Sequence, residues 1–236
     1  MSAKKLAASP TNKLQRLFEL ASNQAGYFTA AQARGLGYSA RSLVHHVAAG
    51  HFERIGRGFY RMTGVPADSH DDIIAAWLRF APRRAVVSHD TALTLYELAP
   101  SRSHEIHLTL PRERRPRTAQ AATAVKLHTT TVPLRRDEVA NRFGVQVTAP
   151  ARTIADVADI GTDPSVIVEA TARALKTGLV SENELHTAVK HRSTRVQQLV
   201  HRAIEEAGAR ASVRHSRRLS CRGRGHAAPA GSLSQG

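Results

Sequence analysis

Apolar residues in the first quarter of the chain recur at helical spacing in short segments. The first segment, 12–23, has apolar positions three and four residues apart, which is typical of an amphipathic helix. Two shorter segments follow, 30–34 and 40–49, and each is preceded by a hydroxyl residue that can cap a helix, Thr29 and Ser39. The pattern predicts three short helices in succession.

A basic hairpin is predicted directly after these helices. Residues 51–62 read as two short strands around Gly56 and Gly58, because glycine permits the positive φ of a tight turn. The segment contains three arginines: Arg54, Arg57 and Arg61. Three helices followed by a basic two-stranded ribbon is the element order of a winged helix-turn-helix, which we expect over residues 1–66.

The rest of the chain alternates between the two periodicities. Helical patterns cover 69–80, 88–98 and most of 150–208, and strand patterns cover 86–87, 105–110, 125–129, 138–141 and 145–148. We therefore predict an α/β (α+β) chain in which a small mixed-sheet domain with C-terminal helices occupies 67–208. Apolar periodicity ends near Gly208, and we expect 209–236 to be a disordered basic tail.

The positive charge lies at the two ends of the chain. The formal net charge is +15; counting Lys and Arg against Asp and Glu gives +7 for 1–66 (9 against 2), +2 for 67–208 (19 against 17) and +6 for 209–236 (6 against 0). This distribution favours a nucleic-acid partner over uniform attraction to a membrane. No apolar run is long enough to span a membrane, no secretion signal is evident, and one cysteine allows no internal disulfide, so a cytoplasmic location is expected.

The predicted fold assigns candidate DNA contacts. In a winged helix-turn-helix the third helix enters the major groove, and its early outward residues meet base edges. Those residues here are Ser39, Arg41, Ser42, His45 and His46. Arg41 could pair with a guanine edge or bind a phosphate, and both remain open. Thr29 and the amides that follow it could bind phosphate, and the three hairpin arginines could contact the backbone or minor groove. A merely solvated basic hairpin is the alternative.

Signals of an enzyme are weak. Ser88, His89 and Asp90 are the residue types of a hydrolytic triad, but consecutive side chains diverge, and a helix cap is the better interpretation. His104 and His107 would point to opposite faces of a strand, and no carboxylate set completes a metal site. No phosphate-binding glycine motif occurs. We predict a non-enzymatic protein without cofactor or metal.

The residues also resemble a known family. The segment GYFTAAQARGLGYSARSLVHHVAAGHFERIGRGFYRM, residues 26–62, resembles the N-terminal winged-helix domain of AbiEi-type antitoxins. The segments VVSHDTALTLYEL, EIHLTLP and VTAPARTIADVAD are similar to the domain that follows in that family. The resemblance places the cap and recognition positions on Thr29, Ser39, Arg41, Ser42 and His45, and the basic wing on Arg54, Arg57 and Arg61. The tail after Gly208 departs from the family.

This resemblance implies a type IV antitoxin. Such a protein would repress its own operon by binding inverted repeats of double-stranded DNA in the promoter, and would antagonise a nucleotidyltransferase-type toxin indirectly. The oligomeric state stays open, with cooperative binding of monomers as one case. Two alternatives remain: a reduced or remnant nuclease-like protein that acts on nucleic acid, and a winged-helix module for protein interaction.

Overall fold

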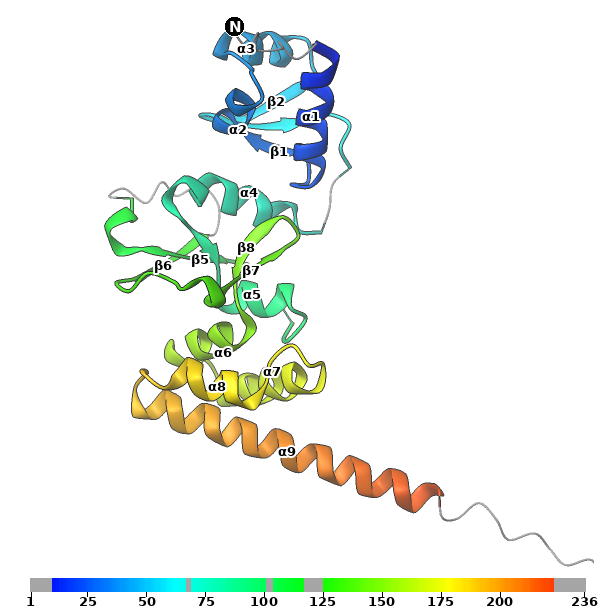
Figure 1. Cartoon of the computed structure of the whole chain (residues 1–236), viewed down its shortest axis with the longest axis vertical. Coiled ribbons are helices and arrows are strands. Elements are labelled where there is room, and N and C mark those ends of the chain that lie inside the picture. The colour runs from blue at the N-terminus through cyan, green and yellow to red at the C-terminus, as the bar shows by residue number, and fades with distance from the viewer. Residues whose placement is uncertain (1–9, 67–68, 101–103, 117–124, 223–236) are drawn as a thin grey trace, which may run out of the picture.

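The computed structural model describes residues 10–66, 69–100, 104–116 and 125–222. The elements form an elongated stack with the N-terminal domain at one end, a sheet in the middle and helices at the other end (Figure 1). In the part of the chain that is described, no helix is both long and apolar enough to cross a membrane.

The N-terminal domain has three helices and a small sheet. The helices are α1 (Pro10–Ser22), α2 (Ala30–Gly35) and α3 (Ala40–Ala48), and the strands are β1 (Tyr27–Thr29), β2 (Phe52–Gly56) and β3 (Phe59–Met62). The sheet is antiparallel with the order β1-β3-β2. Its helices and hairpin confirm the predicted winged helix-turn-helix. The hydrophobic core is centred on Leu17, Phe28, Leu43, Phe52 and Met62.

Strand β1 is an element that the sequence pattern missed. It has only three residues, too few for a period-2 signal, and its partner strand β3 lies about thirty positions further along the chain. Phe28 is fully buried, whereas Tyr27 and Thr29 are half-buried. The strand joins the entry to α2 to the hairpin, so α2, α3 and the wing share one core.

A five-stranded mixed sheet forms the middle of the molecule. Its strands are β4 (Val86–Val87), β5 (Ile106–Pro111), β6 (Val125–Thr130), β7 (Val139–Arg142) and β8 (Val145–Thr148), in the order β6-β5-β4-β8-β7. The β4–β8 and β5–β6 pairs are parallel, and the β4–β5 and β7–β8 pairs are antiparallel. The predicted small mixed sheet is confirmed.

Helices cover both sides of this sheet (Figure 1). They are α4 (Asp71–Phe80), α5 (His89–Leu95), α6 (Pro150–Asp159), α7 (Pro164–Lys176), α8 (Glu182–Val189) and α9 (Thr194–Arg222), with short 3₁₀ turns at Ala81–Arg83, Arg112–Arg114 and Arg136–Glu138. Helix α4 lies between the sheet and the N-terminal domain, while α5 and α6 lie on the other side, followed by α7, α8 and α9. The predicted capping box of Ser181 and Glu184 is present at the start of α8.

The last helix extends into the segment expected to be a basic tail. Helix α9 continues past Gly208 to Arg222, because alanine and arginine are strong helix formers and extending an existing helix needs no new nucleus. Apolar periodicity is therefore not required for a helix that projects beyond the core. The remainder of the expected tail, 223–236, lies outside the described residues.

The two domains meet along α4 and the turn between β7 and β8. Phe59 of the N-terminal domain and Ile74 of α4 belong to one continuous hydrophobic core. The His70 and Phe143 rings stack with centroids 4.1 Å apart. Gly144 approaches the N-terminal domain so closely that a Cβ placed on it would lie 2.3 Å from the carbonyl oxygen of Asn23. The N-terminal domain is thus packed directly against the second one.

Candidate nucleic-acid interface

Side-chain caps determine where the two helices of the helix-turn-helix begin. The Thr29 hydroxyl accepts a hydrogen bond from the Gln32 amide at 3.2 Å, and the Gln32 side chain accepts one from the Thr29 amide at 2.8 Å. The Ser39 hydroxyl accepts from the Ser42 amide at 3.0 Å. Both hydroxyls satisfy amides that helix geometry leaves without partners. Thr29, Ser39 and Ser42 therefore have a structural role that is visible without DNA.

Helix α3 presents a distinct outward face. Leu43 is buried in the domain core at 2% exposure. Arg41, Val44, His45 and Ala48 lie on the opposite side of the helix, at spacings of three, four and seven residues that place them on one face. Val44 is 67% exposed and is the large apolar side chain on this outward face. Sequence reasoning overlooked Val44 because it counted only polar residues as contacts.

The structure does not bring His46 to that face. Its ring packs on Phe52 with centroids 4.8 Å apart, and its Nδ1 lies 3.2 Å from Nδ1 of His51. Burial, together with His51 and His45, lowers the pKa of His46. The half-buried ring supports the junction of α3 with β2, because adjacent residues of a helix point about 100° apart. His45 alone of the two is turned outward.

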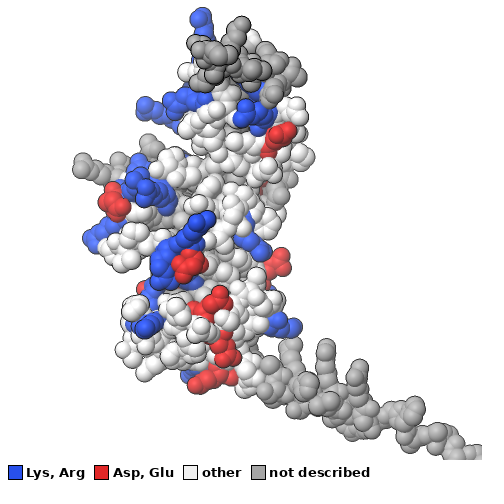
Figure 2. Space-filling model, viewed as in Figure 1, with Lys and Arg blue, Asp and Glu red and all other residues white. Residues whose placement is uncertain are grey.

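The wing carries two exposed arginines. Arg54 lies on β2 and Arg57 on the turn to β3, and both are exposed. The pairing of β2 with β3 shifts between Arg54 and Gly56, so Ile55 is pushed outward to 44% exposure. Figure 2 shows basic side chains projecting from the N-terminal domain, including on its left flank at the level of this hairpin.

Arg61 lies apart from this basic surface. Its guanidinium group donates to the Val65 carbonyl at 3.0 Å, lies 3.6 Å from the Asp71 carboxylate and sits 5.6 Å from the centre of the Tyr27 ring. Only 21% of its side chain is exposed. Arg61 thus connects the N-terminal domain to α4, and the structure brings it to the domain junction instead of the wing tip.

Two arginines of the candidate interface have no partner in the part of the chain that the structure describes. Among the described residues, neither Arg41 nor Arg57 forms a hydrogen bond or an ion pair, whereas Arg54 donates to the Gly56 carbonyl at 3.4 Å. An unpaired guanidinium group presents five donors in a planar fork that matches phosphate or guanine. Glu53 is the exposed acid on β2. The surface is therefore cationic, with an apolar residue at its centre on α3.

Comparison with known families agrees with this geometry. Residues 15–63 match the family model described as "Transcriptional regulator, AbiEi antitoxin". The N-terminal domain is therefore similar to the AbiEi antitoxin regulator domain. The match covers the domain that carries α3 and the wing and leaves the rest of the chain unassigned.

A solved structure is similar to this chain over more than the AbiEi-like domain. The crystal structure of the RV2827C protein from Mycobacterium tuberculosis is similar over 85% of this chain and 78% of that chain, with a TM-score of 0.54 and 14% sequence identity. At that identity the likeness concerns the arrangement of elements alone. No curated protein matches the chain in sequence.

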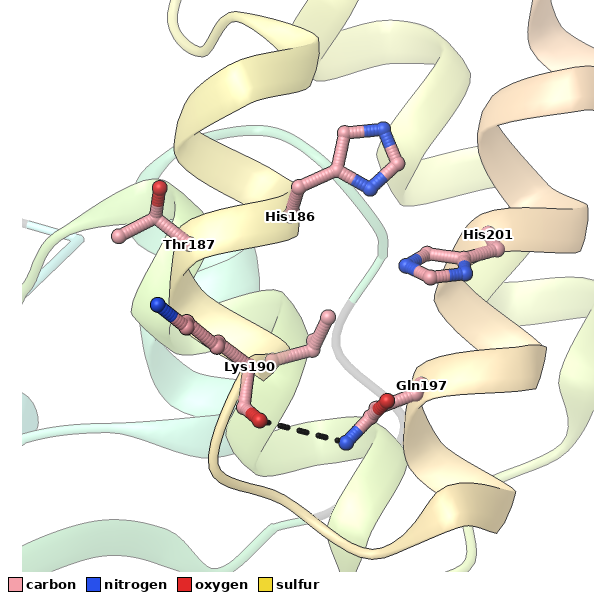
Figure 3. Close-up of a pocket in the computed structure, with 6 residues that line it drawn as sticks. His186, Thr187, Lys190, Gln197 and His201 are labelled. Carbon is pink, nitrogen blue, oxygen red and sulfur yellow. Dashed lines mark hydrogen bonds between the residues drawn. The ribbon is translucent and has the colours of Figure 1, made fainter.

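A shallow groove lies at the opposite end of the molecule, between α8 and α9. His186 and His201 point toward each other across it, and the Gln197 side chain donates to the Lys190 carbonyl at 3.3 Å (Figure 3). His186, His201 and Lys190 are all exposed. These side chains are solvated and form a shallow groove, so the N-terminal surface remains the candidate site.

Proposed function

We propose that this protein is a sequence-specific, DNA-binding transcriptional repressor that uses α3 and the wing. One observation carries the proposal: Arg41, Val44 and His45 share an exposed face of α3, which lies within the residues that match the AbiEi regulator model. Arg54 and Arg57 extend the same cationic surface onto the hairpin. In this arrangement α3 enters the major groove and the wing follows the backbone or the minor groove.

Each side chain has a chemical role in the proposal. Arg41 donates to a guanine edge or to a phosphate, and Val44 contacts a thymine methyl group. Arg57 and Arg54 bind phosphates and increase affinity for every sequence. Thr29, Ser39 and Ser42 orient the N-terminal ends of α2 and α3 toward the DNA sugar-phosphate backbone. His45 completes the outer face of α3. Arg61 and His46, predicted contacts by sequence, support the surface from behind.

The first test is DNA binding as a function of salt. Fluorescence anisotropy with the chain's own upstream DNA should show that Arg57→Ala weakens binding to all sequences and lowers the slope of log K against log salt by about one. Arg41→Ala should additionally relax the choice of base at one position, by about 1–3 kcal/mol of discrimination.

Arg135→Ala is the control for charge. Arg135 is an exposed arginine of the second domain, with 59% of its side chain accessible. Its loss therefore changes the net charge by the same amount and leaves α3 and the wing unaltered. Equal behaviour of all three variants would contradict the placement of the interface, and binding that ignores salt would favour a protein-interaction module.

A second test concerns the exposed valine of α3. Val44→Glu should reduce affinity for DNA at least tenfold, because it places a carboxylate among phosphates in the groove. Val132→Glu is a matched control, since Val132 is 70% exposed and Val44 67% and both substitutions change the net charge alike. Thermal denaturation should show little change for either variant. Similar DNA affinities of the two would argue that α3 does not enter the groove.

The antitoxin role is the finer part of the proposal. The AbiEi regulator domain supports repression of the chain's own operon through promoter inverted repeats, with indirect antagonism of a nucleotidyltransferase-type toxin in the cytoplasm. A promoter–reporter fusion should be repressed by the wild-type chain and released by Arg41→Ala. Equal reporter output with and without the protein would contradict autoregulation.

The carboxylates of the second domain do not favour the nuclease-like alternative. The carboxylates gathered in the described part of the second domain are those of Glu138, Asp156 and Asp159, and each is paired with Arg152 or Arg192. A metal-dependent nuclease needs carboxylates available to a cation. That the chain is not an enzyme stays a prediction.

A further inference from the structure

Three histidines gather on one face of the central sheet. His107 lies on β5, His128 lies on the neighbouring strand β6, and His89 begins α5 directly after β4. The parallel register places Thr109 opposite His128, so His107 and His128 are diagonal neighbours on the same side of the sheet. His89 and His107 are buried, with exposures of 5% and 2%, and His128 is half-buried.

The distances between their nitrogens suit a shared ligand. Each histidine brings a ring nitrogen within 4.8 Å of the other two. Nε2 of His128 and Nδ1 of His107 are 3.3 Å apart, and two nitrogens bound to one tetrahedral zinc ion at 2.0–2.1 Å are separated by about 3.3 Å. The His89 ring stacks on His128 with centroids 3.6 Å apart, so completing the set requires that ring to turn toward the other two nitrogens.

Two buried atoms beside the cluster lack partners. Neither Nε2 of His107 nor Oδ1 of Asp90 has a hydrogen-bond partner, although buried polar atoms are normally paired. A metal-bound imidazole usually donates its other N–H to a carboxylate or carbonyl. With Nδ1 of His107 on a cation, its Nε2 becomes that donor and Asp90 is the neighbouring carboxylate. The two atoms are not hydrogen-bonded to each other in the structure, and Asp90 acts on His107 through its charge, which raises the pKa of His107.

Neighbouring hydroxyl groups hold the His89 ring in its orientation. Its Nδ1 lies 2.9 Å from the Ser88 hydroxyl, which accepts a hydrogen bond from Thr109 at 2.8 Å. Ser88 occupies the expected N-cap position of α5, but its side chain makes no capping hydrogen bond. His89 also has a φ of +53°, a left-handed conformation that is unfavourable for a residue with a Cβ. The partner at Nδ1 leaves Nε2 of His89 as the nitrogen available to a ligand.

Burial disfavours the charged form of all three rings. Burial and the neighbouring His128 lower the pKa of His89 to about 2, and burial and His107 lower the pKa of His128 to about 4. Burial also lowers the pKa of His107, which Asp90 partly offsets. Neutral imidazole is the form that ligates metals. Asp90 and Glu105 supply negative charges near His107, and Lys126, Arg152 and Arg192 are the basic neighbours of the cluster.

We propose that His89, His107 and His128 bind one divalent first-row transition cation, zinc above all, with the remaining coordination position open to water. A set of imidazoles without thiolates or a directly bound carboxylate suits zinc, copper or nickel and disfavours magnesium or calcium. Three protein ligands with one open position is the arrangement of reactive zinc sites, whereas purely structural sites have four. The site belongs to the second domain and is independent of the proposed DNA surface.

Calorimetric titration of the metal-free full-length chain with zinc chloride tests the proposal. The wild-type chain should bind one ion at this site, and His128→Gln should weaken that binding at least tenfold. His128 is chosen because its half-buried position tolerates substitution, and circular dichroism should confirm an unchanged fold. Asp90→Asn should weaken zinc binding about 10- to 100-fold while keeping the stoichiometry, as loss of a supporting carboxylate does.

The exposed histidine pair provides the control. His186 and His201 have ring centroids 4.7 Å apart and face each other across the groove in Figure 3, so they could bind zinc adventitiously. The double variant His186→Gln/His201→Gln should keep the wild-type zinc affinity. Zinc should also raise the melting temperature of the wild-type chain and not that of His128→Gln. The proposal is overturned if the wild type binds no more zinc than His128→Gln, or if only the double variant loses binding.

Discussion

Replacement of Asp156 by alanine is expected to destabilise the protein by about 3–5 kcal/mol, the usual effect of removing one partner from a buried ion pair. Asp156 is 4% exposed and accepts hydrogen bonds from Arg152 at 2.9 Å and from Arg192. Burial alone would lower the pKa of Arg152, but Asp156 and Glu138 outweigh it and raise that pKa. Without Asp156, two largely buried guanidinium groups lose their shared carboxylate.

Asp137→Ala is the matched control for this prediction. Asp137 forms a bidentate pair with Arg135, with both contacts at 3.1 Å, but 70% of its side chain is exposed. Water and salt screen such a pair. Urea unfolding followed by circular dichroism should show a much lower midpoint for Asp156→Ala and a wild-type midpoint for Asp137→Ala. Similar midpoints for the two variants would contradict the structural role of the buried pair.

Gly144→Ala is expected to destabilise the junction between the domains by about 2–5 kcal/mol, a sum of backbone strain and overpacking. Phe143 and Gly144 form the two-residue turn of the β7–β8 hairpin with φ values of +49° and +76°, which is the geometry that favours glycine. A left-handed backbone costs a residue with a Cβ about 1–2 kcal/mol. The new methyl group would also lie 2.3 Å from the Asn23 carbonyl oxygen, and overpacking adds about 1–3 kcal/mol.

Gly161→Ala separates the two contributions. Gly161 has a φ of +80°, and a Cβ added to it would have no neighbouring atom within 4 Å, so alanine there meets only the backbone penalty of about 1–2 kcal/mol. Thermal denaturation should give a lower melting temperature for Gly144→Ala than for Gly161→Ala. Limited proteolysis should cut faster between the domains in Gly144→Ala alone. Equal melting temperatures would show that the N-terminal domain does not rest on this turn.

The winged helix-turn-helix could be predicted because its determinants are local. Helix lengths follow from apolar spacing, the starts of α2 and α3 follow from the caps at Thr29 and Ser39, and the wing follows from Gly58, whose φ is +70°. The same periodicity, applied more strictly, separates outward His45 from inward His46 and places Val44 on the outer face. These errors concern one face of one helix and were within reach of sequence reasoning.

Other assignments depended on partners that are distant in the chain. Arg61 is a basic residue within the hairpin, as a wing contact would be, yet the Asp71 carboxylate and the Val65 carbonyl hold it at the domain junction. Closeness in sequence suggests His104 as the natural partner of His107, whereas His107 meets His89 and His128 from two other elements. No local spacing encodes such a set.

The sequence by itself determined the order of elements other than β1, the winged helix-turn-helix and the concentration of charge at the ends, because periodicity, capping and charge act within a few residues of one another. Only the tertiary structure decided which arginines of the hairpin are exposed, which carboxylate is buried between two guanidinium groups and which histidines converge. Those outcomes depend on strand pairing and domain packing, which join residues that no local pattern connects.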